Sequence, residues 1–465
     1  MNNADRSVIV IGGGIAGIAS ACALADAGYS VRLLERRPYL GGRASSYEHP
    51  GTGEIIDNCQ HVLIGRCTAL LDVYQRLDVQ SRIRWYDRFT FLTPGGKPTI
   101  LKPGPLPAPF HSSLSFLGAP AFSIADKVAI ARGLTHFLRG LPPDSAEDFD
   151  QWLRRHGQTR RAIDRFWKPV LVSALNEDLD RISVHYAAKV FRESFLLSRE
   201  SGRMGIPSIP LSELYNRAIE YIRQRGGEVC LRTSVDGMTP AEDGWTVTAA
   251  ERRFSARSVI LALSFEAMAN LLPLLPPNPA SEELAGKLSQ FEHSPITGIH
   301  LWFDREVTDL DHAVLLDTTI QWMFNKSRLQ PAHRGLEGSY LELVVSASKS
   351  LVPMARQEII DLALRELALF FPVVGSAKLL KAAVVKEVRA TYSIRPMLDS
   401  IRPTAKSPWP GVFLAGDWTA SGWPATMEGA ARSGYLAAEA VTGDLGNPRE
   451  FSVRELPASG LMRFI

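Results

Sequence analysis

The stretch Ser7-Val-Ile-Val-Ile-Gly-Gly-Gly-Ile-Ala-Gly17 lies near the start of the chain and decides the fold. Residues 7–11 are mostly β-branched and predict a short buried strand, and the small residues of 15–27 predict a helix that ends at Gly28. Residues 30–34 then form a second extended run. Strand, tight turn, helix and strand in this order predict the opening of a parallel α/β sheet.

Three glycines in the turn, Gly12, Gly14 and Gly17, have the spacing of a dinucleotide-binding motif, and the acidic Glu35 ends the next strand. Gly12 permits the tight turn, Gly14 lets the backbone approach a pyrophosphate, and Gly17 lets the helix pack closely against the strand. The helix N-terminus then faces the phosphates with its partial positive charge. The Glu35 carboxylate is placed to bind a ribose and would repel the extra phosphate of NADP, so the sequence predicts NAD or FAD.

A second glycine motif, Leu40-Gly41-Gly42-Arg43-Ala44-Ser45, follows shortly after Glu35. It places two glycines and the permanent cation of Arg43 beside the same pyrophosphate. With this motif after the first, the sequence resembles the superfamily of flavin-dependent amine oxidases and phytoene desaturases. The resemblance implies that the dinucleotide is FAD.

The carboxyl-terminal part of the chain supplies an independent match, because Val412-Phe-Leu-Ala-Gly416-Asp417 predicts a strand ending in Gly-Asp and residues 426–441 predict a helix of small residues. The resemblance implies that Asp417 binds the ribityl or pyrophosphate portion of FAD and that the helix N-terminus points at the flavin. It also implies that the backbone at Val235 holds the adenine. The full set of cofactor-binding residues predicted in this way is Gly12, Gly14, Ile15, Ala16, Gly17, Glu35, Arg36, Gly42, Arg43, Val235, Gly416, Asp417, Thr426 and Met427.

The predicted fold is α/β, with a Rossmann-type, glutathione-reductase-like FAD-binding domain assembled from three segments and an interleaved α+β substrate domain. Helices are expected at 124–139, 146–156, 211–225 and 357–370, and strands at 228–232, 296–303, 339–346 and 382–391. The expected domain limits are 1–75, 205–295 and 400–445 for the FAD-binding domain, 76–204 and 296–399 for the substrate domain, and 446–465 for a C-terminal tail.

Composition excludes several other classes of protein. The 465 residues have a formal net charge of +3, which is too balanced for a protein recruited to nucleic acid by bulk charge. The four cysteines form no Cys-x-x-Cys pair, which argues against a structural metal site or a disulfide framework. No apolar run reaches the ~18 residues of a membrane span. We expect a cytoplasmic protein, with peripheral contact at the inner face of the cytoplasmic membrane through the apolar, Pro-rich segment 103–122; a buried loop covering the second domain is the alternative for that segment.

The substrate is indicated by Asp57-Asn-Cys-Gln-His61, together with Trp85-Tyr86 and the Pro-rich run that follows. Here the sequence resembles the squalene-associated branch of the superfamily, the hydroxysqualene dehydroxylases of squalene and hopanoid biosynthesis. The resemblance implies an apolar isoprenoid substrate whose allylic hydroxyl leaves as water, after which hydride from reduced FAD quenches the allyl cation. Such a reaction needs a dry apolar site, a proton donor and an aligned flavin face.

Two side chains are the candidate catalytic proton donors. His61 lies in the segment expected near the flavin, and Asp57 would qualify if burial raised its pKa. Tyr392 and Arg395, which precede the last flavin strand, are weaker candidates. The sequence does not identify the electron donor that reduces FAD.

Three alternatives share the FAD motifs. A phytoene-type carotenoid desaturase would use oxidised FAD to remove hydride from a polyene. A flavin amine oxidase would flank the flavin with two aromatic rings, of which Trp423 matches one, whereas Thr426 precedes Met427 where the second is expected. A non-catalytic membrane adaptor would retain FAD only as a structural group.

Overall fold

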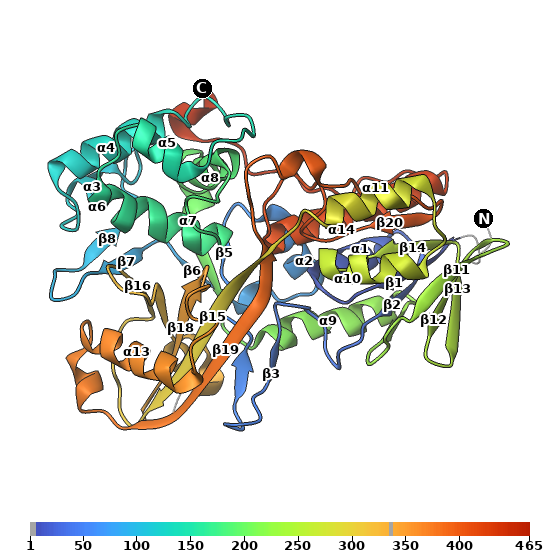
Figure 1. Cartoon of the computed structure of the whole chain (residues 1–465), viewed down its shortest axis with the longest axis horizontal. Coiled ribbons are helices and arrows are strands. Elements are labelled where there is room, and N and C mark those ends of the chain that lie inside the picture. The colour runs from blue at the N-terminus through green and yellow to red at the C-terminus, as the bar shows by residue number, and fades with distance from the viewer. Residues whose placement is uncertain (1–5, 334–337) are drawn as a thin grey trace.

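The computed structural model describes residues 6–333 and 338–465. Figure 1 shows one part built around a parallel sheet near the N-terminus of the chain, and a second part in which a layer of helices lies above a large mixed sheet. The parallel sheet has the order β10-β2-β1-β14-β20, and every neighbouring pair is parallel. Its strands are β10 (Glu228–Cys230), β2 (Ser30–Leu34), β1 (Ser7–Ile11), β14 (Ser258–Leu261) and β20 (Val412–Leu414).

Helices cover both faces of this sheet because alternate residues of its strands point in opposite directions. Val8 and Val10 pack into the cluster formed with α1, α2, α9 and α14, while Ile9 and Ile11 pack on the opposite face with α10 and α11. The helices are α1 (Ile15–Asp26), α2 (Thr68–Arg76), α9 (Leu211–Gln224), α10 (Phe265–Leu271), α11 (Pro279–Leu288) and α14 (Met427–Asp444). The α/β architecture expected from the first residues is confirmed.

The mixed sheet has seven strands in the order β19-β15-β18-β17-β16-β7-β8, with one parallel pair between β16 and β7. The expected strands at 296–303, 339–346 and 382–391 are confirmed within its three longest strands. Its strands are β7 (Phe89–Leu92), β8 (Thr99–Leu101), β15 (His293–Phe303), β16 (His312–Leu315), β17 (Trp322–Asn325), β18 (Ser339–Ser346) and β19 (Leu379–Tyr392); α12 (Lys326–Leu329) and α13 (Arg356–Ala368) accompany it.

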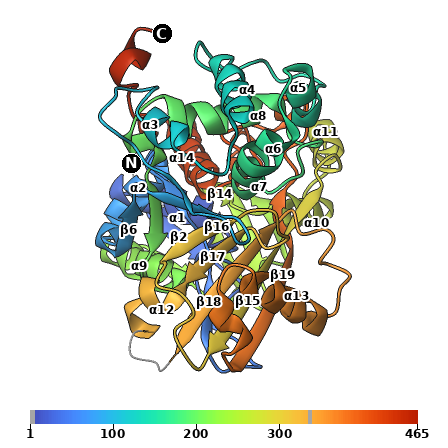
Figure 2. The same cartoon turned by 90° about the vertical axis from the view of Figure 1, so that its left-hand side faces the viewer.

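Figure 2 shows the helical layer above this sheet. Its helices are α3 (Ser113–Leu117), α4 (Ile124–Thr135), α5 (Phe149–Arg155), α6 (Arg160–Ala162), α7 (Lys168–Leu175) and α8 (Val184–Phe191). The expected helix at 146–156 begins three residues late because Asp148 acts as its N-cap and accepts a hydrogen bond from the Gln151 amide. The expected helix at 124–139 is also too long, since α4 ends at Thr135.

Short strands complete the structure. They form three small antiparallel sheets: β3 (Ser46–Glu48) with β4 (Ile55–Asp57); β5 (Leu63–Ile64), β9 (Met204–Pro207) and β6 (Ile83–Tyr86); and β11 (Gly237–Ala241), β12 (Gly244–Ala249) and β13 (Arg252–Ala256).

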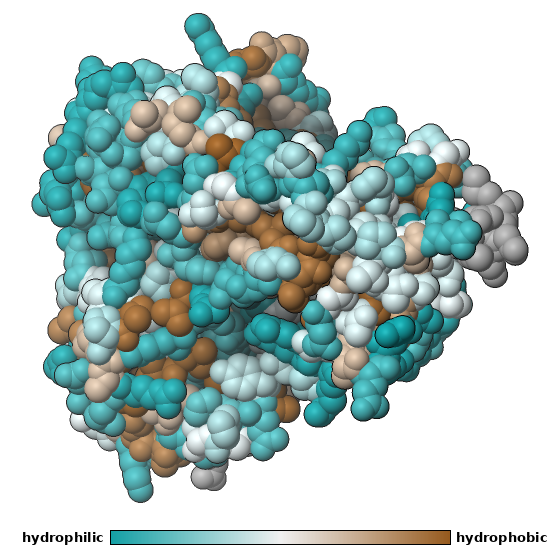
Figure 3. Space-filling view, turned by 45° about the vertical axis from the view of Figure 1, so that its right-hand side comes forward, coloured by the Kyte–Doolittle hydropathy of each residue, from teal (hydrophilic) through white to brown (hydrophobic). Residues whose placement is uncertain are grey.

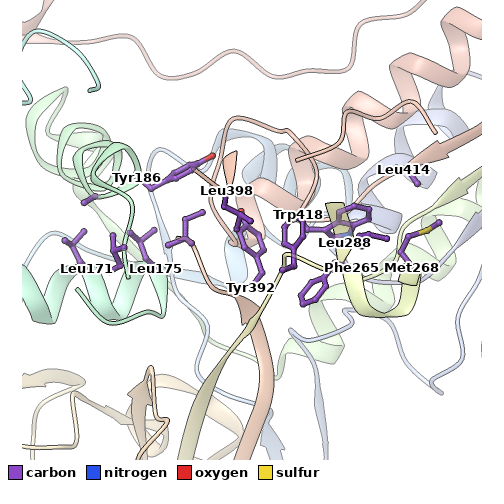
Figure 4. Packing of buried hydrophobic residues seen from close by; sticks show 14 of the residues in the cluster. Leu171, Leu175, Tyr186, Phe265, Met268, Leu288, Tyr392, Leu398, Leu414 and Trp418 are labelled. Carbon is purple, nitrogen blue, oxygen red and sulfur yellow. The ribbon is translucent and has the colours of Figure 1, made fainter. Parts of the chain in front are cut away.

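One hydrophobic core joins the two parts. Figure 4 shows part of this cluster, in which Leu171, Leu175 and Tyr186 from the helical layer continue through Tyr392 and Trp418 to Phe265 and Met268 beside the parallel sheet. The strands β15 and β19 run from the mixed sheet towards the parallel sheet (Figure 1), and Tyr392 at the end of β19 is fully buried. The two parts are therefore held together by apolar packing.

The contact between α1 and α14 depends on glycine, which gives a test. A Cβ added at Gly434 of α14 would lie 2.2 Å from the Ala16 carbonyl oxygen of α1. We expect Gly434→Ala to push α14 away and to lower the free energy of unfolding by ~1–3 kcal/mol, together with a loss of dinucleotide affinity.

Gly286 of α11 is the matched control, because a Cβ there meets nothing within 4 Å. Gly286→Ala should stabilise the protein by ~0.5–1 kcal/mol, since alanine loses less backbone entropy in a helix. Chemical denaturation of both variants measures these changes in the free energy of unfolding. Equal changes in the two variants would contradict the described packing.

Candidate functional site

The glycine turn after β1 forms a cradle at the N-terminus of α1. Gly12 has φ +106°, and a Cβ there would lie 2.4 Å from the Ala262 carbonyl oxygen; a Cβ at Gly17 would lie 1.9 Å from the Gly12 carbonyl oxygen. A Cβ at Gly14, in contrast, would project into space where its nearest neighbour is Gly42 Cα at 4.0 Å. The turn is therefore closely packed behind and open in front, where a phosphate would lie.

The second glycine motif lies directly against the first. The Gly41 amide donates to the Gly13 carbonyl over 2.8 Å, and both Gly41 and Gly42 have positive φ, at 109° and 63°. Ile15 and Ala16, in the first turn of α1, are buried behind this pair of turns. Within the described residues no side chain caps α1 and no acidic residue lies in its first turn, so its N-terminal amides are suited to a phosphate anion.

Glu35 is buried beside the turn, as the motif predicts. Its Oε2 accepts a hydrogen bond from the Gly13 amide over 2.7 Å and its Oε1 accepts one from the Arg37 amide over 2.7 Å. The backbone carbonyl of Glu35 accepts from the Thr233 amide over 2.8 Å, so the segment leading to the half-buried Val235 runs alongside. Carboxylate and segment together suit an adenosine ribose.

Arg37, which the sequence reasoning missed, points towards the cradle. Its guanidinium donates to the Gly42 carbonyl over 2.7 Å, whereas Arg36 is exposed. The contact of Arg36 with a cofactor stays a prediction. The signal that could have found Arg37 is the alternation of a strand end, which points successive side chains in opposite directions.

Arg43 and Asp417 form an ion pair that joins the first and last segments of the site. Arg43 Nη2 lies 2.7 Å from Asp417 Oδ1, and Arg43 Nη1 donates to the Ala390 carbonyl over 2.9 Å. Arg43 is thus more than a cation beside a pyrophosphate, because it also fixes the carboxylate of the Gly416-Asp417 motif. The Gly416 amide in turn donates to Ser433 Oγ of α14 over 2.9 Å.

The N-terminus of α14 is ordered by its own side chains. Thr426 is the N-cap, and its Oγ1 accepts from the Gly429 amide over 3.1 Å. Met427 Sδ lies 3.5 Å from the Tyr215 hydroxyl, which donates to it. The fully buried Glu428, in the first turn of α14, accepts hydrogen bonds from the amides of Ala69 and Leu70. Its side chain therefore caps the N-terminus of α2 and attaches α2 to α14. Nothing in the local sequence indicated the role of Glu428.

Asp57 is the first of the two predicted proton donors, and the expectation that burial raises its pKa is wrong. Burial alone would raise the pKa of Asp57, but the ammonium of Lys326, at 2.6 Å from Oδ2, lowers it below its ordinary value. Ser46 Oγ and the Leu211 amide also donate to the carboxylate. Asp57 is therefore a buried, ionised hydrogen-bond acceptor and has no proton to give.

Lys326 and Glu342, both missed by the sequence reasoning, complete a buried charged cluster with Asp57. Lys326 Nζ donates to Gln60 Oε1 over 2.9 Å and lies 3.2 Å from Glu342 Oε2. Burial lowers the pKa of Lys326, but the two carboxylates outweigh burial and raise it. Burial raises the pKa of Glu342 to about 7, because Lys326 is already shared with Asp57. Lys326 and Glu342 come from 269 and 285 residues beyond Asp57, and only the folded chain brings them together.

His61, the second predicted proton donor, is half-buried. Its Nδ1 lies 2.7 Å from the Cys59 carbonyl oxygen, which fixes the tautomer with the proton on Nδ1. Burial lowers the pKa of His61, so the ring is neutral near pH 7 and Nε2 is an acceptor. The neighbouring Asn58 donates from Nδ2 to the Arg43 carbonyl over 3.2 Å, which attaches the 57–61 segment to the second glycine motif.

Tyr392 is buried close to the Arg43–Asp417 pair. It follows two residues after Ala390, whose carbonyl accepts a hydrogen bond from Arg43. Burial raises the pKa of Tyr392, so its hydroxyl stays protonated. Among the described residues this hydroxyl has no hydrogen-bond partner. Arg395 is different, since its guanidinium is paired with the Glu292 carboxylate over 2.6 Å.

Aromatic side chains of the helical layer pack in a continuous row. Ring centroids are 5.7 Å apart for Phe116 and Phe122, 5.9 Å for Phe116 and Phe166, and 5.5 Å for Phe166 and Phe191. Phe195 follows at 5.9 Å from Phe191. The same apolar core reaches Tyr392 and Trp418. Figure 3 shows a hollow between the two parts of the molecule with hydrophobic residues beside it.

Trp423 is enclosed by charged groups. Lys189 Nζ lies 4.9 Å from the ring centroid, Arg432 Cζ lies 5.1 Å from it, and the indole Nε1 donates to Glu455 Oε1 over 3.3 Å. Two cations already occupy the π-faces of this ring, and Thr426 caps α14 where a second ring was expected. An aromatic pair that receives an ammonium ion is therefore not formed by these two residues.

Comparison with known proteins agrees with this architecture. The model of the family described as flavin-containing amine oxidoreductase matches residues 15–442. The 15-cis-phytoene desaturase of Solanum lycopersicum is 28% identical over 94% of this chain and 78% of its own length. From Synechococcus elongatus, a 15-cis-phytoene desaturase is 27% identical over 93% of this chain and 95% of its own, and a probable zeta-carotene desaturase is 26% identical over 93% and 98%.

Solved structures share the fold at low identity. An oxidoreductase from Methanosarcina mazei superposes with a TM-score of 0.72 at 18% identity, over 94% of this chain and all of that one. Putrescine oxidase with bound putrescine gives 0.71 at 16% identity, over 94% of this chain and 99% of that one. The fold is thus that of FAD-dependent amine oxidases, and the cofactor for which the open cradle at Gly14 is suited is FAD.

The buried cluster gives a second test. Lys326→Met would leave Asp57 and Glu342 buried without their cation, and we expect a loss of ~3–5 kcal/mol in the free energy of unfolding at neutral pH. Lys287→Met, which removes an exposed i,i+4 pair with Glu283, should cost much less. Urea denaturation of both variants measures this, and equal losses would show that the cluster is not ionised as described.

Proposed function

Because the chain belongs to the family of flavin-containing amine oxidoreductases, we propose that it is an FAD-dependent oxidoreductase acting on a long apolar isoprenoid. The specific reaction we propose is the reductive dehydroxylation of hydroxysqualene to squalene, within squalene and hopanoid biosynthesis. The observation that supports an apolar substrate is the row of aromatic rings in the helical layer, which shares one core with Tyr392 and Trp418 beside the cofactor motifs. The likeness to desaturases of apolar carotenoids over most of the chain supports the same substrate class.

The residues that would hold FAD are those of the two glycine turns, Glu35 and the carboxyl-terminal motif. The pyrophosphate would lie against the backbone of Gly12, Gly14, Gly17 and Gly42. Glu35 would bind the ribose, and the Arg43–Asp417 pair would bind the ribityl chain. Bound and reduced, FAD supplies hydride. An allylic cation requires a site from which water is excluded, and the apolar core beside the cofactor motifs would provide such surroundings.

The proton for the departing hydroxyl would come from His61 or Tyr392. His61 stays a candidate because it lies on the segment attached to Arg43, although its neutral ring must first take up a proton. Tyr392 is an alternative because its buried hydroxyl is protonated and without a partner in the described chain. Asp57 is withdrawn, since its pKa is lowered by Lys326.

Phytoene-type desaturation is the second candidate, and the named relatives favour it. The two reactions differ in direction, because desaturation starts from oxidised FAD and dehydroxylation consumes reduced FAD. Oxidation of an amine is less well supported, since Lys189 and Arg432 lie on the ring of Trp423 and would repel an ammonium group.

The direction of the reaction can be measured directly. Reduced protein mixed anaerobically with hydroxysqualene should recover the absorbance of oxidised flavin and form squalene in a single turnover, whereas oxidised protein should not be bleached by phytoene. The opposite pattern would replace dehydroxylation by desaturation, and no change with either substrate would favour an adaptor.

Loss of the proton donor should slow the turnover ~10²–10⁴-fold, so His61→Gln and Tyr392→Phe identify it. Tyr74→Phe, which alters a tyrosine pair in the other core, is the control.

We also propose a docking surface for anionic lipid membranes, centred on α3 and the start of α4. In the described chain no helix is long and apolar enough to cross a bilayer, so the contact would be peripheral. Leu117 is 63% exposed and Ile124 is 82% exposed. Further exposed apolar side chains of this surface are Leu106, Phe110, Leu114 and Val128. Residues 88–125 contain no acidic side chain but contain Arg88, Lys97 and Lys102, which suits lipid phosphates.

The carboxyl-terminal residues extend this surface. The Leu461 amide donates to the Ala108 carbonyl over 2.9 Å, and Met462 is buried against Ala108 and Leu197. Phe464 is left 87% exposed next to it. Figures 1 and 2 both show the C-terminus beside the helical layer. Two segments far apart in sequence thus form one apolar face.

Vesicle sedimentation tests the surface. The triple variant Leu117→Gln, Ile124→Gln and Phe464→Gln should lower partitioning onto phosphatidylglycerol vesicles at least ~tenfold. Leu274→Gln, Leu380→Gln and Val388→Gln, which are 54%, 51% and 48% exposed in the native chain, form the control and should bind as before. Unchanged sedimentation, or a dimer that dissociates in the triple variant with no effect on vesicles, would overturn the lipid assignment.

A further inference from the structure

The buried cluster of Asp57, Lys326 and Glu342 lies behind the segment that approaches the cofactor motifs. Asp57 and Gln60 bind Lys326 from one side of this segment, and Asn58 binds the Arg43 carbonyl from the other. Asp57 is 3% exposed, Lys326 is 1% exposed and Glu342 is fully buried. The segment 57–61 is therefore held between a charged cluster and the second glycine motif.

We propose that Lys326 is a positioning residue that fixes the 57–61 segment at the flavin site, and that Glu342 is a proton-binding group whose charge is coupled to that of the flavin. The proposal rests on FAD binding at this site and does not depend on which substrate is turned over. Its geometric basis is a single cation shared by two carboxylates. Lys326 can neutralise one of them, and its shorter contact, 2.6 Å against 3.2 Å, goes to Asp57.

The other groups that face Glu342 are uncharged near neutral pH. His300 lies directly opposite on β15, its Nδ1 lies 2.8 Å from the Tyr340 hydroxyl, and burial lowers its pKa to about 3. Burial also raises the pKa of Tyr340 and of Cys59 well above their ordinary values. Burial lowers the pKa of His333, whose ring packs on Tyr340.

On the remaining side, β17 places Phe324 opposite Glu342. Asp57 and Lys326 are thus the only charges, among the described residues, that face this carboxyl at neutral pH. The cluster has no net charge when Glu342 is protonated and one negative charge when it is not. With the pKa of Glu342 at about 7, both states are populated near neutrality.

Coupling between Glu342 and the flavin must be reciprocal. Reduction adds negative charge at the flavin, and a second buried negative charge nearby opposes it. Reduction should therefore favour protonation of Glu342, and ionisation of Glu342 should lower the reduction potential of bound FAD. The proton comes from solvent and the electrons come from the reductant used in the measurement.

Folding stability should change with pH for the same reason. Because the pKa of Glu342 is raised above 4.5, its value in model compounds, the folded state holds a proton that the unfolded state has lost between pH 4.5 and about 7. Stability therefore falls as pH rises through this window and should not fall in Glu342→Gln. This readout needs no cofactor.

The test measures the potential of bound FAD by spectroscopic titration with dithionite between pH 5.5 and 8.5. When the reduction potential is plotted against pH, the wild-type protein should show an additional break in the slope near pH 7. Glu342→Gln should lack this break. Infrared spectra should show a band of a protonated buried carboxyl that weakens as pH rises through 7, and Glu342→Gln should lack this change. In Asp57→Asn the disappearance should move to lower pH, because Lys326 then serves Glu342 alone.

Glu177→Gln is the matched control. Glu177 is also fully buried and paired with a lysine, Lys349, but its pKa is lowered by that partner and by Ser393 despite burial, so it does not titrate near pH 7. This variant should retain the break and the infrared band. Identical potentials in wild type and Glu342→Gln at every pH would overturn the coupling. The same loss of carboxyl band near pH 7 in Glu342→Gln as in the wild type would overturn the assignment of the proton, and either result leaves the proposed reaction unaffected.

Discussion

The close approach of α1 to the turn after β1 is the constraint on which the rest of the structure depends. Gly17 lies so near the Gly12 carbonyl that any side chain there would collide with backbone. This contact places the N-terminal amides of α1 beside Gly14, where an added Cβ would have Gly42 Cα, at 4.0 Å, as its nearest neighbour. Gly434 makes a second close contact of the same kind, where α14 packs against Ala16 of α1. Because glycine has no side chain, these positions allow two helices and two turns to lie close enough together to bind one dinucleotide.

The three segments of the site are joined by interactions of different kinds. The middle segment enters through backbone pairing, since β10 lies beside β2 and the Thr233 amide bonds to Glu35. The last segment is joined by charge, through the Arg43–Asp417 pair. Residues 57–61 are joined by both, because Asn58 binds backbone and Asp57 binds an ammonium. A cofactor site built in this way is formed only when distant parts of the chain are already folded together.

Charge and apolar surface are separated within the molecule. Charges near the site include the buried Asp57–Lys326–Glu342 cluster and the buried Asp417 with its half-buried partner Arg43, each with partners that offset the cost of desolvation. The helical layer contributes aromatic rings to the core that reaches Tyr392. The same arrangement explains why the enclosed Trp423, with cations on its ring, resembles an amine-binding aromatic in sequence and differs from one in its surroundings.

The sequence by itself determined the parallel sheet, the two glycine turns, Glu35 and the Gly416-Asp417 motif, because these features follow from short-range rules of backbone geometry and helix polarity. It also predicted the long strands of the mixed sheet from their apolar alternation. Helix boundaries were less well predicted, since Asp148 acts as an N-cap and α5 therefore begins three residues later than the sequence pattern indicated.

Tertiary structure decided the ionisation of the site. The pKa of Asp57 depends on Lys326, and that of Glu342 depends on both, yet these residues are separated by up to 285 positions in the chain. Electrostatic energy depends on distance and burial in space, and neither can be read from spacing along a polypeptide. The same reason explains why Lys326, Glu342 and Glu428 had no signal in the sequence, although each holds a segment of the folded site in place.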